Sequence, residues 1–144
     1  MAWRNNISSP VRDSSKPEVL LNIALQQLHE KGLTDLEIVL RKTKPDQSYP
    51  EDEFYVYLDG PPHDGKEETD DWITEQLERR QKRVLRVRFK RFSESKATRL
   101  AETIQRIRRD IRLGLIPKPW VRCIDIEDLT NNEDVAKILE AHPP

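Results

Sequence analysis

An aspartate, a glycine and a histidine follow one another closely near the middle of the chain. Asp59 ends a run of alternating apolar residues, Gly60 follows it directly, and His63 lies four positions after Asp59. Asp46 lies upstream in a turn-rich segment and could fold back beside them. Two neighbouring carboxylates suit a hard divalent cation such as Mg²⁺, which prefers oxygen ligands. A histidine, whose unperturbed pKa lies near neutrality, could act there as general acid or base.

Each of these residues also has a structural interpretation. An Asp that precedes a Gly is most often a turn residue, so Asp59 could simply end its strand. A single histidine such as His63 is more often a hydrogen-bonded or surface residue than a catalyst. The spacing alone leaves both interpretations open.

The charge of the chain is concentrated in one block. The net charge is −1, yet residues 79–112 hold 14 Lys/Arg and 3 Asp/Glu, whereas residues 1–78 hold 8 Lys/Arg and 17 Asp/Glu. Such a basic block indicates either an anionic partner or a solvated helix face. If the partner is DNA, the candidates for phosphate contacts, which give affinity without sequence choice, are Arg86, Arg88, Lys90 and Arg91.

The first elements needed to position these residues are a helix and two strands. Ser15–Glu18 fits a capping box with a proline in the first turn, so we expect a helix that ends near Lys31–Gly32. Alternating residues predict a strand over 36–41 and a clearer one over 54–59. Because side chains alternate along a strand, Asp59 shares a face with Tyr55 and Tyr57.

The second half of the pattern continues the alternation of helices and strands. A helix over about 64–80 should turn Trp72, Ile73 and Leu77 inward. The strand 84–89 should run parallel to 54–59, because a helical crossover connects them. Its residues Arg86 and Arg88 share one face. A long helix capped by Ser93 and ending at Gly114 follows, with an apolar stripe of period near 3.6.

This order, α-β-β-α-β-α, predicts an α/β fold with a mixed sheet flanked by helices. We expect a flexible arm over 1–14, one domain over 15–113, and a small C-terminal extension over 114–144 with a short strand near 121–124 and a short helix from about 130 to 141. Cys123 is the only cysteine and there are three histidines, which argues against a disulfide or a multi-histidine metal site. Without an apolar run of about 20 residues, we expect a cytoplasmic protein with no membrane contact.

The motifs resemble one branch of a nuclease superfamily. The segment Tyr55–His63, with Asp70, Leu77 and the strand Arg83–Val87, is similar to the very-short-patch-repair-like branch of the PD-(D/E)xK, or restriction-endonuclease-like, nucleases. Upstream, Ser15–Glu18 matches the helix start of that family. Asp46 precedes Asp59 by thirteen residues, as the family spacing requires. The resemblance covers residues 15–112 and implies a restriction-endonuclease-like fold.

The sequence departs from the superfamily at its metal site. The glutamate that lies two residues before the strand-end position is Tyr57 here, and the position of the catalytic lysine is taken by Asp59. The glycine before the last motif strand is Gln81. The repair-type branch also lacks that glutamate and uses a histidine, so the resemblance still implies a possible active site.

The resemblance implies a metal-dependent endodeoxyribonuclease acting in DNA repair or defence. Asp46 and Asp59 would hold Mg²⁺ or Mn²⁺, His63 would move a proton, and Glu18 would reach the metal through water or only cap its helix. The alternative is a catalytically degenerate module of the same fold that binds DNA or a helicase-like partner. A third hypothesis is an interaction protein whose arginine-rich helix meets an acidic protein or the acidic N-terminal part of its own chain.

Overall fold

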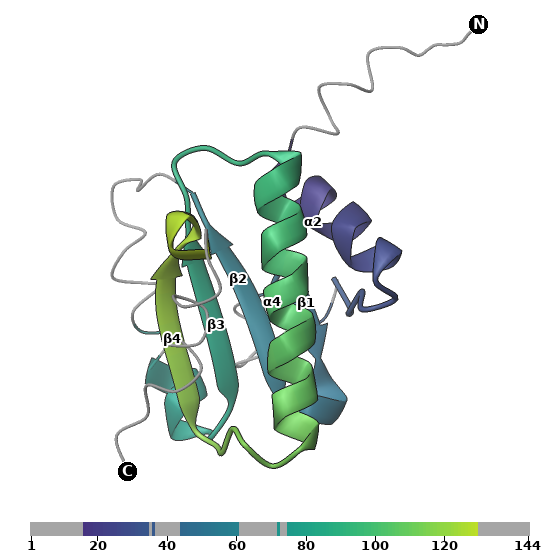
Figure 1. The fold of residues 1–144 in the computed structure, drawn as a ribbon. Helices are drawn as coiled ribbons and strands as arrows, with labels where there is room; N and C mark the ends of the chain where they lie inside the picture. Colours follow the sequence, from purple (N-terminus) through teal and green to yellow (C-terminus); the bar gives the residue numbers. More distant parts are fainter. Residues whose placement is uncertain (1–15, 35, 37–43, 61–71, 73–74, 130–144) are drawn as a thin grey trace, which may run out of the picture.

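The chain forms an α/β fold built on a four-stranded mixed sheet (Figure 1). The computed structural model describes residues 16–34, 36, 44–60, 72 and 75–129. In spatial order the strands are β1 (Gln47–Tyr49), β2 (Phe54–Asp59), β3 (Arg83–Arg88) and β4 (Trp120–Asp125). β1 runs antiparallel to β2, whereas β2, β3 and β4 run parallel to one another.

The structure confirms the α/β class and the parallel pairing of the second and third predicted strands. β4 also confirms the short strand expected near 121–124. The arm over 1–14 and the C-terminal helix from about 130 lie outside the described residues. The strand expected over 36–41 lies outside them as well, apart from Leu36.

β1 corrects the expectation that Asp46 and the residues after it lie in a turn-rich segment. All three of its side chains are buried. The side-chain amide of Gln47 accepts a hydrogen bond from the backbone N–H of Gly32 at 2.8 Å and donates one to Asn22. A short, buried and mostly polar strand has no alternation of polar and apolar residues, so hydrophobic periodicity cannot reveal it.

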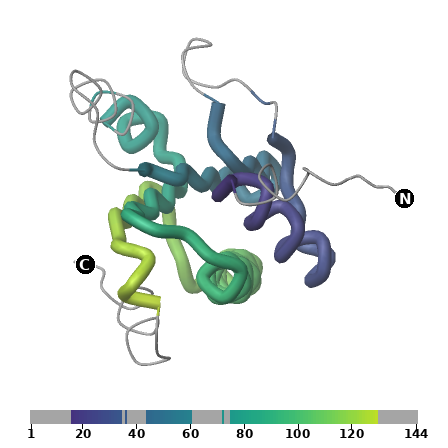
Figure 2. The backbone as a smooth tube through the Cα atoms, turned by 90° about the horizontal axis from the view of Figure 1, so that it is seen from above, coloured from purple at the N-terminus to yellow at the C-terminus, as the bar shows by residue number. Residues whose placement is uncertain are grey.

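Two helices, α2 (Pro17–Gln27) and α4 (Glu94–Arg112), cover one face of the sheet. Figure 2 shows them on one side and helical residues 75–79 on the other. The larger core lies beneath α2 and α4, and its largest fully buried side chains are Leu21, Leu25, Tyr49, Phe54, Leu85, Leu100, Ile104, Ile107, Ile116, Trp120 and Leu129. A smaller core on the opposite face consists of Tyr55, Tyr57, Leu77 and Val84.

Helix α4 forms as its sequence predicts. The hydroxyl of Ser93 accepts a hydrogen bond from the backbone N–H of Lys96 at 3.3 Å, which satisfies one of the free donors of the first turn. The buried residues of α4 recur with helical spacing. After Arg112, Gly114 takes a left-handed conformation with φ of 77°, which glycine adopts without steric cost.

The ends of α2 differ from the prediction. Its N-cap is Lys16, which makes no side-chain capping hydrogen bond, so Glu18 lies in the first turn without the expected capping box. Pro17 sets this start, because its fixed φ suits the first helical position. At the other end, His29 takes the left-handed conformation with φ of 58°, and the helix stops before Gly32.

Of the side chains that the helix predicted over 64–80 should bury, the structure describes two, and only one of them is buried. Leu77 is 1% exposed, as predicted. Trp72 is 41% exposed, so its inward placement is wrong. Ile73 lies outside the described residues. Among the residues the structure describes, no helix is both long and apolar enough to cross a bilayer.

The packed core continues past residue 113. β4 pairs along its whole length with β3, and Trp120 and Ile124 join the larger core. Residues 126–129 form a 3-10 turn, η2, that buries Ile126 and Leu129 against the same core. The described part of the expected C-terminal extension is therefore integral to the sheet domain.

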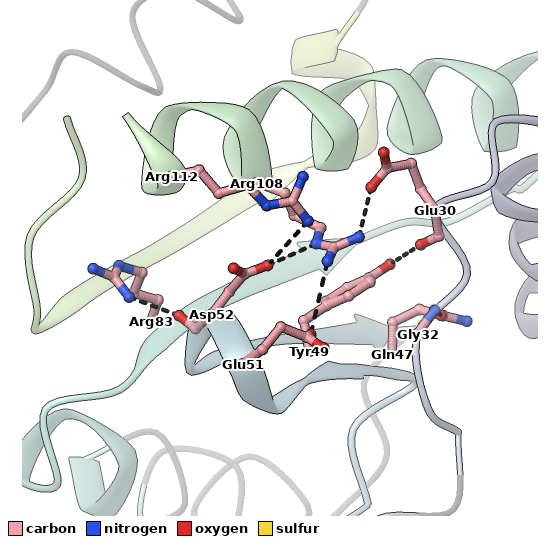
Figure 3. Close-up of polar contacts among 9 residues, drawn as sticks. All are labelled: Glu30, Gly32, Gln47, Tyr49, Glu51, Asp52, Arg83, Arg108 and Arg112. Atoms are coloured by element: carbon pink, nitrogen blue, oxygen red, sulfur yellow. Dashed lines mark hydrogen bonds and ion pairs between the residues drawn. The ribbon is translucent and has the colours of Figure 1, made fainter. Parts of the chain in front are cut away.

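A buried arginine in α4, Arg108, binds acidic residues from two other segments of the chain (Figure 3). The guanidinium of Arg108 bonds to Asp52 at 2.8 Å and to Glu30 at 2.6 Å, and it lies 4.2 Å from the ring centroid of Tyr49. The hydroxyl of Tyr49 donates to the carbonyl oxygen of Glu30 at 2.8 Å. Asp52 is 6% exposed and belongs to the 3-10 turn η1 (Pro50–Asp52). One side chain therefore links α4, η1 and the loop after α2.

We predict that Arg108→Met lowers the free energy of unfolding by about 3–5 kcal/mol, because it leaves the buried carboxylate of Asp52 with only the more distant Arg112, at 3.9 Å, and removes the bond to Glu30. The neighbouring Arg109→Met is the matched control. The side chain of Arg109 is 66% exposed, so its loss should change stability by no more than about 0.5 kcal/mol. Urea denaturation of the three proteins measures both values. Equal stability of the two variants would contradict the structural role of Arg108.

Candidate functional site

The carboxyl end of β2 holds an ion pair made inside the fold. Both carboxylate oxygens of Asp59 accept hydrogen bonds from Arg86, from Nε at 2.9 Å and from Nη2 at 2.7 Å. The guanidinium of Arg86 also lies 4.9 Å from the ring centroid of Tyr57. Arg86 is 6% exposed as a residue, so the pair is desolvated on the arginine side. This bidentate geometry is the strongest form of an arginine–carboxylate contact.

The parallel register of β2 and β3 produces this pair. Tyr57 lies level with Arg86, and Asp59 lies level with Arg88. All four side chains point to the face that carries the smaller core, as the strand alternation predicts. Arg86 lies two residues before the position on β3 that is level with Asp59, and its long side chain reaches forward to the tip of β2.

Asp46 lies beside the same tip, immediately before β1. Its backbone N–H donates to the carbonyl oxygen of Val56 at 2.9 Å, and its carboxylate accepts from the backbone N–H of Leu58 at 2.7 Å. These two bonds fix Asp46 next to the residue that precedes Asp59. The prediction that Asp46 folds back toward Asp59 agrees with this placement.

Two other acidic residues, Glu18 and Asp59, act on the pKa of Asp46. Burial raises the pKa of Asp46 to about 6, although the hydrogen bond from Leu58 opposes the shift. The charges of Glu18 and Asp59 raise this pKa further, and the charge of Arg86 lowers it. Glu18 is exposed in the first turn of α2, whose start lies at the same end of the sheet as the tips of β2 and β3 (Figure 1). His63 lies outside the described residues.

The described residues do not fit a resident Mg²⁺ or Mn²⁺. Such a cation needs free carboxylate oxygens, but both oxygens of Asp59 are bound to Arg86 and one oxygen of Asp46 is bound to Leu58. Within the described ranges no group of three His, Cys, Asp or Glu side chains is arranged to hold a metal ion.

The predicted phosphate-binding residues divide into two groups. Arg86 is buried against Tyr57 and Asp59, which corrects the expectation that it lies on the surface with Arg88. Arg88, Lys90 and Arg91 are exposed, and none of their side chains pairs with an acidic residue in the described part of the chain. They lie in the segment that leads from β3 to Ser93, the N-cap of α4. The exposed cationic segment from Arg88 to Arg91 therefore begins next to the tip of β2, where Asp59 lies.

The partnership of Arg86 with Asp59 is the site feature that the sequence analysis missed. The signal was present, because both residues were assigned to adjacent parallel strands. The pattern did not show that Arg86 and Asp59 lie on the same face of the sheet. Once Tyr57, Arg86 and Asp59 lie on one side of the sheet, a pair between the two charged residues is the expected outcome.

Comparisons of this chain with protein-family models, with curated proteins and with solved structures find no match.

We predict that Asp46→Asn stabilises the fold at neutral pH. In the folded protein the pKa of Asp46 is raised from 3.8 to about 6, so folding favours the protonated form and stability falls as pH rises from about 4 to 6. Asparagine keeps an acceptor for the Leu58 N–H and carries no charge. The gain should be near zero at pH 4 and about 1–3 kcal/mol at pH 7.

Urea denaturation of both proteins at pH 4 and pH 7 measures this difference. Glu78→Gln, which removes an exposed carboxylate, is the control and should leave the pH dependence as in the unmodified protein. If Asp46→Asn is less stable than the unmodified protein at pH 7, the raised pKa of Asp46 is contradicted.

Proposed function

We propose that this chain is a nucleic-acid-binding module of nuclease-like design in which exposed cations at the carboxyl end of β3 hold the phosphates of DNA. The observation that carries this proposal is the segment from Arg88 to Arg91. It presents three exposed positive side chains, at Arg88, Lys90 and Arg91, and none of them is neutralised by a described acidic residue.

The position of this segment supports phosphate binding. The backbone runs from the carboxyl end of β3 directly into the N-terminus of α4, which begins at Glu94. A helix N-terminus carries a partial positive charge and favours anions. The backbone N–H of Phe89 donates to the carbonyl oxygen of Asp59 at 3.1 Å, so the start of the segment is anchored to the sheet. Anchored cations lose less conformational entropy when they contact a ligand.

A metal-dependent endodeoxyribonuclease is the second candidate. The observation that favours it is the position of Asp46 beside the tip of β2, where the charges of Glu18 and Asp59 both raise its pKa. This function would require a cation at the site, and the Arg86–Asp59 pair opposes one. For this reason the binding module is the better-supported proposal.

The binding proposal predicts that charge reversal of Arg88, Lys90 and Arg91 to Glu weakens binding to all DNA sequences alike. Each lost phosphate contact removes about 0.9 from the slope of log K against log salt, so the triple variant should flatten the slope by about 2–3. Fluorescence anisotropy with a labelled duplex at several salt concentrations measures this change.

The matched control reverses two exposed cations at the opposite end of β3, Arg79 and Arg80. Because these residues precede the strand that Arg88 ends, they lie about six strand residues, or roughly 20 Å, from the proposed contact segment. Their reversal should leave most of the salt slope in place. An equal loss in both variants would rule out a binding segment localised at the carboxyl end of β3.

Supercoiled plasmid incubated with Mg²⁺ or Mn²⁺ distinguishes the two candidates. The binding module leaves the plasmid intact even at protein concentrations that saturate the DNA. Nicking that Asp46→Asn abolishes, with DNA binding unchanged, would instead establish the endonuclease.

A further inference from the structure

We propose that the turn after α4 is a contact site for an anionic lipid bilayer, in which two leucines enter the bilayer surface and two arginines hold its headgroups. This leucine turn (residues 113–119) lies at the lower end of α4 in Figure 1, opposite to the proposed DNA-binding segment, so the inference does not rest on the proposed function. The sequence analysis expected no membrane contact for lack of a long apolar run. Such a run is needed to cross a bilayer but not to lie on its surface.

Leu113 and Leu115 are the most exposed large apolar side chains in the described part of the chain, at 64% and 62%. Only Gly114 separates them, and its φ of 77° turns the backbone at this point. Apart from its two chain neighbours, no described atom lies within 4 Å of the position that a Cβ of Gly114 would take. The two leucines therefore belong to a turn that is open to its surroundings.

The capping of α4 does not account for the exposure of Leu115. The N–H of Gly114 donates to the carbonyl oxygen of Ile111 at 3.0 Å, and the N–H of Leu115 donates to that of Asp110 at 2.9 Å. This pair of bonds is a Schellman motif, in which the residue at the position of Leu115 commonly packs on an apolar side chain of the last helical turn. The positions that would supply that contact are Arg109 and Asp110, so the usual apolar contact is missing.

The backbone of the leucine turn suits apolar surroundings. The N–H groups of Leu113, Gly114 and Leu115 are all bonded to carbonyl oxygens of α4, at 3.0, 3.0 and 2.9 Å. Pro117 and Pro119 have no N–H group to satisfy. Lipid tails offer no acceptor, so a segment that enters a bilayer surface must not carry unpaired donors. This property favours a lipid surface over a protein partner, which supplies acceptors of its own.

The charges beside the leucines favour an anionic surface. The side chain of Arg109 is 66% exposed and lies 3.7 Å from Asp110, which is 14% exposed. The side chain of Arg112 is 55% exposed and lies 3.9 Å from Asp52, which is 6% exposed. Arg109 precedes Leu113 by four residues and shares its side of the helix. A surface that meets the leucines therefore meets the arginines first, with these two acidic partners beneath them.

The next residue holds the leucine turn in place. Ile116 is 2% exposed, and its carbonyl oxygen accepts a hydrogen bond from Nε of Arg83 at 2.9 Å. A turn fixed to β3 in this way loses little conformational entropy on contact. Two leucines and two cations should bind more weakly than a single myristoyl chain, so half of the protein should bind at a lipid concentration on the order of 1 mM.

The experiment measures cosedimentation of the protein with vesicles of phosphatidylglycerol and phosphatidylcholine in equal parts. Leu113→Ser and Leu115→Ser should each lower the partition coefficient about tenfold, because each removes an inserted apolar side chain. The matched control is Ile23→Ser, which removes a 43% exposed aliphatic side chain from α2 and should leave binding unchanged. Because the leucines are exposed, both variants should fold, and urea denaturation checks this.

Charge variants test the role of the arginines. Arg109→Gln/Arg112→Gln should weaken binding to the anionic vesicles by about 10–30-fold and remove the preference over phosphatidylcholine alone. Charge reversal of Arg88, Lys90 and Arg91 should leave vesicle binding unchanged, because the 19 residues of α4 place that segment roughly 28 Å away, beyond the Debye length of about 10 Å.

Three results would each overturn the inference. The first is no binding of the unmodified protein to the anionic vesicles. The second is binding that survives both leucine variants but is lost on reversal of the segment from Arg88 to Arg91, since the lipid would then be held there. The third is a dimer in sedimentation velocity without lipid that Leu115→Ser converts to a monomer, because the turn would then contact a second copy. DNA binding by the leucine variants should equal that of the unmodified protein, which separates this inference from the proposed function.

Discussion

The parallel pairing of β2 with β3 sets the geometry on which both cores and the candidate site depend. With Val56 level with Leu85, the apolar side chains of both strands turn toward α2 and α4. The same register puts Tyr57 level with Arg86 on the other face. A slip by one residue would exchange these faces, placing charged side chains under the helices and apolar ones against Asp59. The buried apolar face therefore also fixes where the charged groups meet.

Periodicity predicted those parts of the fold in which apolar side chains repeat with a regular spacing. The strands predicted over 54–59 and 84–89 and the helix after Ser93 all show such repeats, and all three were found, the second strand one residue earlier, at 83–88. β1 was missed, because Gln47 and Ser48 are buried through hydrogen bonds and backbone pairing rather than through apolar character. Periodicity measures apolar alternation, and it gives no signal for a strand whose buried residues are polar.

The candidate site was predicted in part for a related reason. The sequence indicated that Asp46 could fold back beside Asp59, and the structure agrees. It grouped Tyr57 with Asp59 on one strand and Arg86 with Arg88 on the next, but did not place the two groups on the same face of the sheet. Arg86 was expected at the surface, because the alternation of side chains shows which residues share a face of a strand but not whether other elements pack against that face. Leu77, from the helical residues 75–79, packs with Tyr55, Tyr57 and Val84 on that face. Whether a face of a sheet is covered depends on tertiary packing, which the alternation of residues does not show. Because this face is covered, Arg86 forms an internal ion pair with Asp59 instead of the expected phosphate contact.

Two buried arginines contribute differently to this molecule. Burying a guanidinium carries a desolvation cost of several kcal/mol that only well-formed partners offset. Arg108 offsets it by linking α4 to η1 and to the loop after α2, segments that no strand pairing connects. Arg86 links β2 to β3, which six paired positions already hold together. At this position Arg86 supplies a positive charge to the carboxyl end of β2, where it binds Asp59 and lowers the pKa of Asp46.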